Sequence, residues 1–280
     1  MTAPGDSKAR RILVALDASP ASAAACTTAA EIAATIGAEL IGVFVEDDLL
    51  LRSAELPLTQ LVGSHSAEIL PFSSRDITSQ LKVQAERARR AIATIAGRAN
   101  VAWSFRISRG GVSTVLKQAA VEVDLVSVGS TGWSRHREQP VGTTLASLFG
   151  DSRGHILVTR QSGQHTGPIA IVLDSTSPTD ELIEASMAFP RTAQSERELF
   201  IVAHHEATAG EVERTARAGL AARGLHGKAY WLGPPQPGLV ARSSAGRGVL
   251  IMAARCPVVA RDIDLSRFLR AVACPVLFVR

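Results

Sequence analysis

Two groups of glycine and threonine near the middle of the chain have the types and spacing of an anion-binding site. Gly129 and Gly132 bracket the tight turn GSTG, and nine residues separate Gly132 from the run Gly142, Thr143 and Thr144. Glycine admits positive φ angles and lets backbone N–H groups approach an anion with no Cβ in the way. The second run precedes LASLF, the expected start of a helix, whose free N–H groups and hydroxyls would hold phosphate oxygens. These residue types have the chemistry that a polyphosphate site needs.

The residues between these glycines add positive charge but do not decide the matter. They include Arg135, His136 and Arg137, which are placed to reach the outer phosphates. Taken alone, the glycines fit a simple turn, an exposed loop and a helix cap better than a binding site. The prediction therefore depends on the elements that position them.

The first half of the chain alternates apolar strands with helices, which predicts a parallel sheet covered on both faces. Ser19 is expected to cap a helix that begins at Pro20 and stops at Gly37. The stretch 46–74 is expected to be irregular, either covering the site as a lid or packing on the partner domain. The expected strands are 11–17, 39–45, 101–108, 124–129 and 155–160.

A second helix is expected over residues 76–97, before the third strand. Its broad apolar face is predicted to consist of Ile77, Leu81, Val83, Ala88 and Ile92.

Three residues follow or end strands at the same edge of this predicted sheet. Asp17 ends the first strand, Val45 the second and Gly129 the fourth. Ligands of open α/β sheets bind beyond the carboxyl ends of the strands, where the strand order switches. We therefore expect Asp17, Val45 and Gly129 to lie on one rim.

The chain contains the same unit twice. RILVALDASP near the start is repeated as PIAIVLDSTSP from residue 168, and HILVTR is repeated at the end as PVLFVR. The polar linker QSGQHTG separates the copies. We predict an α/β protein with domains 1–162 and 167–280, each an open, mainly parallel five-stranded sheet with helices on both faces. The closing strands should pair the two domains as a pseudo-dimer, packed face to face.

Composition narrows the choice of partners and compartment. The net charge of +4 is scattered and aromatic residues make up only 4% of the 280, so no nucleic-acid partner is expected. No apolar run approaches the ~20 residues of a membrane span, and the N-terminus lacks the apolar core of a signal peptide. Cys26 and Cys274 are expected to be core residues, which fits a reducing compartment. The predicted location is the cytoplasm.

Other chemistries lack their signatures. The phosphate motifs G-x-x-x-x-G-K-[ST] and G-x-G-x-x-G are absent at the expected places, which disfavours P-loop kinases and dinucleotide dehydrogenases. Neither a nucleophile elbow nor an HExxH or CxxC metal motif occurs. We assign no catalytic residue and no metal ligand.

With these elements in place, the sequence resembles the universal stress protein family. The pattern G-x-x-G, nine residues and G-[ST], after a DLVSVG strand, is similar to that family's nucleotide-binding signature. RILVALDASP resembles its first strand, and CPVLFVR its closing strand. The resemblance implies a HUP/Rossmann-like fold that binds ATP, with Mg²⁺, ADP or AMP as further candidates. It places these residues around the nucleotide: Ala15 and Leu16 beside the adenine, Asp17 near the ribose, the Val45 backbone against the adenine, Val128 at the flank, and Gly129, Gly132, Gly142, Thr143 and Thr144 around the phosphates.

The second copy departs from this pattern. Aligned with the first, it has Ala253 and Cys256 in place of the two glycines of the turn and Asp262 in place of Gly142. A carboxylate directed at a phosphate site repels the ligand. Asp174 keeps the acid of the first strand, although ending a strand suffices to explain it. The second domain is therefore expected not to bind ATP and to serve as an intramolecular partner.

Three functions remain open at this point. The favoured one is an ATP-binding stress-response or signalling protein, in which nucleotide in the first domain regulates conformation or the binding of an unidentified protein partner. The second is a slow ATPase or nucleotidyl-transferring enzyme, with Asp17 or Glu138 positioning water or Mg²⁺. The third is a nucleotide-free dimerisation adaptor. A homodimer of the whole chain is left open.

Overall fold

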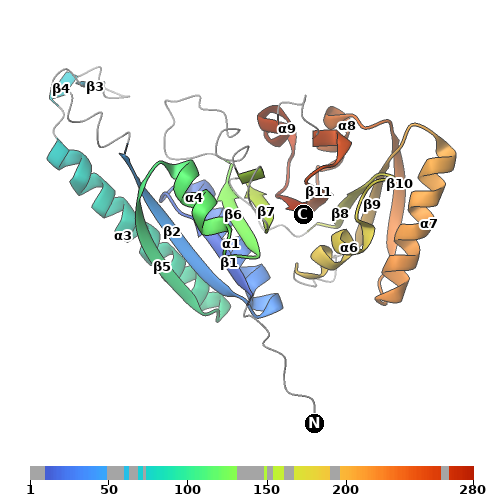
Figure 1. The fold of residues 1–280 in the computed structure, drawn as a ribbon, viewed down its shortest axis with the longest axis horizontal. Helices are drawn as coiled ribbons and strands as arrows, with labels where there is room; N and C mark the ends of the chain where they lie inside the picture. Colours follow the sequence, from blue (N-terminus) through green and yellow to red (C-terminus); the bar gives the residue numbers. More distant parts are fainter. Residues whose placement is uncertain are drawn as a thin grey trace, which may run out of the picture.

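A single sheet of ten strands organises the molecule, as a computed structural model shows (Figure 1). Each half contributes five of them, and helices cover both faces of the sheet. The structure describes residues 10–48, 60–62, 69–71, 74–130, 148–149, 154–160, 167–189, 196–259 and 265–280.

The first unit runs from the first strand to the seventh. Its elements are β1 (Arg11–Ala15), α1 (Pro20–Ile36), β2 (Glu39–Asp47), β3 (Gln60–Val62), β4 (Ile69–Pro71), α3 (Ser74–Ala99), β5 (Trp103–Gly110), α4 (Val112–Ala120), β6 (Leu125–Gly129) and β7 (His155–Thr159).

The second unit repeats this order with shorter helices. Its elements are β8 (Ile169–Leu173), α6 (Thr179–Met187), β9 (Arg197–Val202), α7 (Glu206–Ala222), β10 (Gly227–Gly233), α8 (Pro237–Ser243), β11 (Val249–Ala253), the 3₁₀ turn η1 (Pro257–Val259), α9 (Leu265–Ala271) and β12 (Val276–Val279).

Local chemistry sets the bounds of α1 as predicted. The Ser19 side chain accepts a hydrogen bond from the N–H of Ser22 at 3.1 Å, and Pro20 occupies the first turn. Gly37 ends the helix with a φ of +68°, a left-handed conformation that glycine adopts without a steric penalty. This helix begins at the end of β1 and so presents its N-terminus to the rim of the sheet.

The two units have the same strand order. It is β7-β6-β1-β2-β5 in the first and β12-β11-β8-β9-β10 in the second, and all strands within a unit are parallel. The units join where β7 and β12 pair antiparallel, with Leu157 opposite Leu277. The predicted pairing of closing strands is confirmed, but the units meet edge to edge rather than face to face, because this pairing continues the backbone hydrogen bonds of one sheet.

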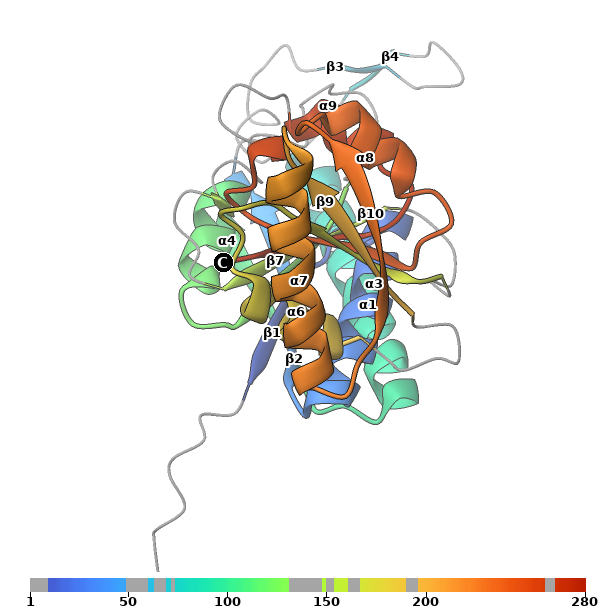
Figure 2. The same ribbon diagram turned by 90° about the vertical axis from the view of Figure 1, so that its right-hand side faces the viewer.

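Two apolar layers lie on opposite faces of this sheet. One packs α1, α3, α6 and α7 against it, and the other packs α4, α8 and α9. The helix α3 and the strand β5 lie at one end of the molecule, and the helix α7 and the strand β10 lie at the other (Figures 1 and 2). Cys26 and Cys274 are buried in these layers, as predicted.

Three details of the first unit and the second were predicted wrongly or missed. Within the stretch expected to be irregular, β2 continues to Asp47, and β3 and β4 form a separate antiparallel pair. Val83, which was predicted to lie on the apolar face of α3, is 51% exposed. It follows the buried Leu81 by two residues, and side chains two residues apart point to nearly opposite sides of a helix. The helix α9 was not anticipated.

Among the described residues, no helix is long and apolar enough to cross a membrane.

Candidate functional site

The end of β1 directs successive residues to opposite faces of the sheet. Ala15, half-buried, packs with the layer around α4. Leu16 packs its side chain into the opposite layer, against α1 and α3, and is 4% exposed. Its N–H donates to the carbonyl of Val43 at 2.9 Å. Only the backbone of Leu16, therefore, can face a ligand at the rim.

Asp17 lies in a hydrogen-bonded turn between β1 and α1. Its Oδ1 accepts a hydrogen bond from the Ser19 N–H at 2.9 Å, and its own N–H approaches Ser22 Oγ at 3.4 Å. Ala18 between them has a φ of +60°, a conformation that non-glycine residues adopt rarely. The turn fixes the half-buried carboxylate of Asp17 at the rim, next to the first turn of α1.

The end of β6 approaches the same turn of α1. A Cβ at Gly129 would lie 2.8 Å from the backbone carbon of Ala21 and 2.9 Å from the nitrogen of Ser22. One turn further along α1, the hydroxyl of Ser127 donates to the Ala25 carbonyl at 3.1 Å. Close helix packing thus requires glycine at position 129, independently of any ligand.

The remaining predicted residues divide into two groups. Val45 on β2 is half-buried, and Val128 on β6 is 6% exposed; both pack with the layer that contains Ala15. Because β1 pairs with both β2 and β6, the carboxyl ends of these three strands are neighbours, as expected. Outside the described residues lie Gly132, Gly142, Thr143 and Thr144, together with Arg135, His136, Arg137, Glu138 and Asp262.

Strand register identifies the counterpart of Gly129 in the second unit. Gly129 pairs with Thr159 of β7, and Ala253 pairs with Val279 of β12 in the same way. The N–H of Ser130, which follows Gly129, donates to the Thr159 carbonyl at 2.8 Å. In the same way, the N–H of Ala254 donates to the Val279 carbonyl at 2.8 Å. The alignment of Ala253 with the first glycine of the turn is supported by this register.

The acid of the second unit has a different environment from Asp17. Asp174 is only 6% exposed. Its Oδ1 accepts from the N–H of Thr176 at 2.6 Å and from the hydroxyl of the same residue, and its Oδ2 accepts from Ser177 Oγ at 3.0 Å. Both carboxylate oxygens are therefore engaged within the protein.

Cys256 closes this second rim. It is 1% exposed and precedes η1, with its N–H donating to the Ala253 carbonyl at 3.0 Å. Burial raises the pKa of the Cys256 thiol to about 12, and the neighbouring Asp174 carboxylate adds to the rise, against a backbone hydrogen bond from Val258 that lowers it. The neutral thiol lies where the aligned sequence of the first unit has Gly132.

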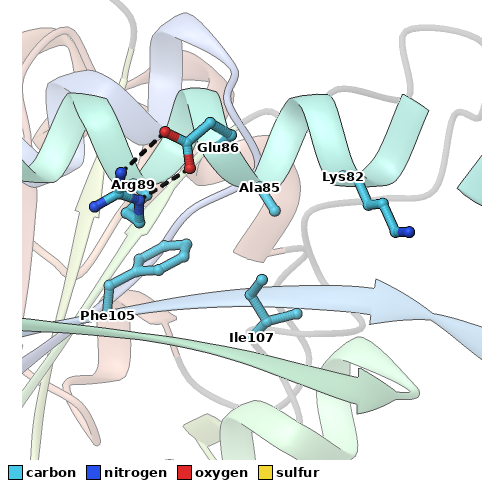
Figure 3. Close-up of a pocket in the computed structure, with 6 residues that line it drawn as sticks. All are labelled: Lys82, Ala85, Glu86, Arg89, Phe105 and Ile107. Atoms are coloured by element: carbon cyan, nitrogen blue, oxygen red, sulfur yellow. Dashed lines mark hydrogen bonds and ion pairs between the residues drawn. The ribbon is translucent and has the colours of Figure 1, made fainter. Parts of the chain in front are cut away.

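The parts of the chain that the structure describes hold no candidate metal centre, and the pocket found there lies away from the rim. No group of three or more His, Cys, Asp and Glu side chains there is placed to hold a metal ion. A groove of about 340 Å³ lies between α3 and β5, at the outer edge of the sheet (Figure 3). Glu86 in it accepts hydrogen bonds from Arg89 and Arg90, which lower its pKa to about 2. The residues that line the groove are Lys82, Ala85, Glu86, Arg89, Phe105 and Ile107.

One polar residue beside the rim escaped prediction. Thr159, the last residue of β7, is completely buried, and its Oγ1 has no hydrogen-bond partner among the residues that the structure describes. Comparing HILVTR with PVLFVR could have drawn attention to it, because valine occupies this place in the second copy.

Comparisons with known proteins agree with the fold. Residues 8–160 match the model of the universal stress protein family. No curated protein matches the sequence. A universal stress protein from Archaeoglobus fulgidus DSM 4304 is similar over 98% of this chain and 99% of its own, with 14% identity and a TM-score of 0.67.

Two further solved structures are similar to the chain. A functionally unknown protein from Pseudomonas aeruginosa PAO1 is similar over 97% of this chain and 92% of its own, with 13% identity and a TM-score of 0.53. A universal stress protein family protein from Arabidopsis thaliana with AMP bound is similar over 56% of this chain and 95% of its own, with 16% identity and a TM-score of 0.37. The two likenesses that span nearly the whole chain agree with its organisation as two α/β units.

Proposed function

The chain belongs to the universal stress protein family, and we propose that it binds one ATP, in the first unit only. In this proposal residues 1–162 form the binding domain and residues 167–280 a domain that has lost the site. The bound nucleotide regulates the conformation of the protein, and through it the binding of a protein partner, in a stress response or signalling role.

The contrast between the two strand-end acids carries this proposal. Asp17 is half-buried at the rim and is held by a turn beside the N-terminus of a long helix, where an anion is favoured. Asp174 is buried, with both oxygens engaged, next to the thiol of Cys256. A ligand at the rim can reach the half-buried Asp17, whereas Asp174 is covered by the second unit itself.

Each predicted residue that the structure describes has a role that fits its position. The backbone of Leu16 and Val45 and the small side chain of Ala15 bound the adenine, Asp17 accepts from ribose hydroxyls, and Val128 supports the pocket from the apolar layer. The phosphates are assigned to Gly129, Gly132, Gly142, Thr143 and Thr144. A Mg²⁺ ion bound with the nucleotide would neutralise phosphate charge, and oxygen donors such as the carboxylate of Asp17 suit it.

Nucleotide binding of this kind couples directly to stability. At ATP concentrations about a thousandfold above Kd, binding to the folded state alone adds ~4 kcal/mol to the free energy of unfolding. The protein would then respond to cellular ATP through its folded population and its shape.

The test is to purify the protein, denature it and identify any released nucleotide by mass. We expect ATP or ADP from the wild type and none from Gly142→Asp, which introduces the residue that the second copy carries at Asp262. Asp262→Gly is the matched control in the other unit and should release as much nucleotide as the wild type. A wild type that comes out empty and shows no thermal shift with added ATP would refute the proposal.

A further inference from the structure

The strand β5 forms one outer edge of the ten-stranded sheet. In the part of the chain that the structure describes, only β2 pairs with it. The Ala102 carbonyl accepts the N–H of Leu40 on β2, and successive residues of a strand direct their backbone groups to alternate sides. Phe105 and Ile107 therefore direct their N–H and carbonyl groups to the open edge.

The side chains of the same two residues line the groove of about 340 Å³ between β5 and α3. Figure 3 shows both side chains pointing from the strand towards the helix. Ile107 is 54% exposed and Phe105 is half-buried, so the groove has an apolar floor that a ligand can reach. An apolar groove beside an open strand edge is suited to an extended peptide, because the edge supplies backbone hydrogen bonds and the groove holds alternate side chains.

Positive charges outnumber negative ones around this groove. Arg89 and Arg90 both bind Glu86, at 2.9 and 3.0 Å, so the charge of that acid is already matched. Lys82 in the groove and Arg106 on the other face of β5 are exposed, and neither forms an ion pair with any residue that the structure describes. An acidic partner complements these charges. A second copy of β5 does not, because the strand carries arginines and no acid.

The opposite edge of the sheet, formed by β10, is less suited to an added strand. Its register with β9 shifts between Trp231 and Gly233, and an irregularity of this kind protects an edge strand from further pairing. Lys228 on β10 already has an ion-pair partner, Glu196, at 3.2 Å. By contrast, β5 pairs with β2 over all of its 8 residues without a shift. Its backbone is therefore regular enough to template another strand.

We propose that the β5 edge and its groove bind an extended, acidic segment of a partner protein that has apolar residues at alternate positions. The segment adds a strand to β5 and places its apolar side chains over Phe105 and Ile107. Its acidic side chains face Arg106 on one side of the sheet and Lys82 at the end of the groove. This surface lies at the outer edge of the sheet, and its role holds whether or not the rim binds ATP.

Titration of the full chain with the peptide DELELED, blocked at both ends, tests this surface. As a strand, the peptide has two leucines between two aspartates on one face and glutamates on the other. We expect a Kd of about 100 μM, because an unstructured peptide spends part of its interaction energy on ordering. The peptide KKLKLKK, with lysines in place of the acids, should bind about tenfold more weakly.

Variants of the chain provide matched controls for the groove. Ile107→Glu should weaken the binding of DELELED about tenfold, because it removes an apolar contact and repels the acids. Val83→Glu alters a side chain that is exposed to a similar extent, 51%, but lies outside the groove, and it should bind like the wild type. Lys82→Glu should weaken binding about fourfold, since a single exposed ion pair contributes little.

Hydrogen exchange of the β5 amides identifies what covers the edge. The amides of Phe105 and Ile107 should exchange more slowly when DELELED is bound. Protection of the same amides without peptide, increasing with protein concentration, would show that a second copy covers the edge and would overturn the proposal. No binding of DELELED at about 1 mM, equal binding of both peptides, or wild-type binding by Ile107→Glu would overturn it as well. A chain that binds the peptide but no ATP would refute the proposed function alone.

Discussion

The two units carry the same acid after the same strand, and both acids are held by a similar turn, yet Asp17 is half-buried and Asp174 is buried. Asp17 is half-buried at the rim, and its Oδ1 accepts a hydrogen bond from the backbone N–H of Ser19. Asp174 is enclosed by Thr176, Ser177 and the thiol of Cys256. A repeated fold therefore does not imply a repeated site, because the few residues after each strand decide whether a ligand can reach it.

The second unit retains what the sheet needs. Its strand order is identical to that of the first, and β12 covers the edge of β7 that would otherwise be open. The unit has shortened in its helices, with 9 residues in α6 against 17 in α1, and in the connection after its second strand, with 3 residues (203–205) between β9 and α7 against 26 (48–73) between β2 and α3. The pairing of β12 with β7 is what the second unit would contribute as the intramolecular partner proposed for it.

The largest expected effect is a difference in the free energy of unfolding between substitutions at Gly129 and at Ala253. In Gly129→Ala the new Cβ would meet the backbone of α1 at 2.8 Å, which the helix can relieve only by moving. We expect a loss of about 3 kcal/mol in the free energy of unfolding. Ala253→Gly should cost about 1 kcal/mol, because it adds chain entropy and removes one buried methyl group. Chemical denaturation of both variants checks the difference, and equal losses would mean that the two strand ends pack alike.

A second pair of variants separates the two acids, because one substitution should lower stability and the other should weaken ATP binding. Asp174→Asn replaces an acceptor oxygen by a donor among other donors and should destabilise the protein by about 2 kcal/mol, without changing ATP binding. Asp17→Asn keeps an oxygen for the Ser19 N–H at a half-buried position and should cost less stability than Asp174→Asn, while weakening ATP binding. Thermal unfolding and ATP titration of each variant measure both effects. The reverse pattern would assign the site to the second unit.

The smallest expected effect concerns the seam between the units. His155 at the start of β7 accepts the N–H of Arg280 at Nδ1, at 3.2 Å. Burial lowers the pKa of His155, against the carboxylates of Asp124 and Glu184, which raise it. A lowered folded-state pKa contributes stability that is present above the unfolded value, ~6.5, and is lost as the pH falls through the folded value.

We therefore expect the melting temperature to decline below about pH 6.5 and the decline to be shallower in His155→Asn, whose side chain keeps an acceptor and does not titrate. Melting curves between pH 5 and 8 provide the measurement. Parallel curves for the two proteins would show that His155 does not titrate with folding.

The sequence predicted best what local chemistry controls. Ser19, Pro20 and Gly37 fix the ends of α1 by capping and backbone geometry alone, and they were identified correctly. The position of Ala253 as the counterpart of Gly129 followed from the repeat. The rim residues Asp17, Val45 and Gly129 were placed at one edge because the carboxyl ends of parallel strands lie at the same edge of a sheet.

What the sequence did not reveal depends on contacts between distant segments. The pairing of the closing strands was predicted, but their antiparallel, edge-to-edge register depends on contacts between β7 and β12, which no local pattern encodes. The strands β3 and β4 have 3 residues each, too few to show an alternation. The unpaired hydroxyl of Thr159 and the requirement for glycine at 129 are properties of packing against other elements.

The number of nucleotides bound per chain tests the central claim most directly. Native mass spectrometry of the intact protein, titrated with ATP, should show saturation at one nucleotide per chain. Gly142→Asp should show none, and Asp174→Asn should still show one. A wild type that takes up two nucleotides, or one that persists in Gly142→Asp, would contradict the assignment of a single site to the first unit.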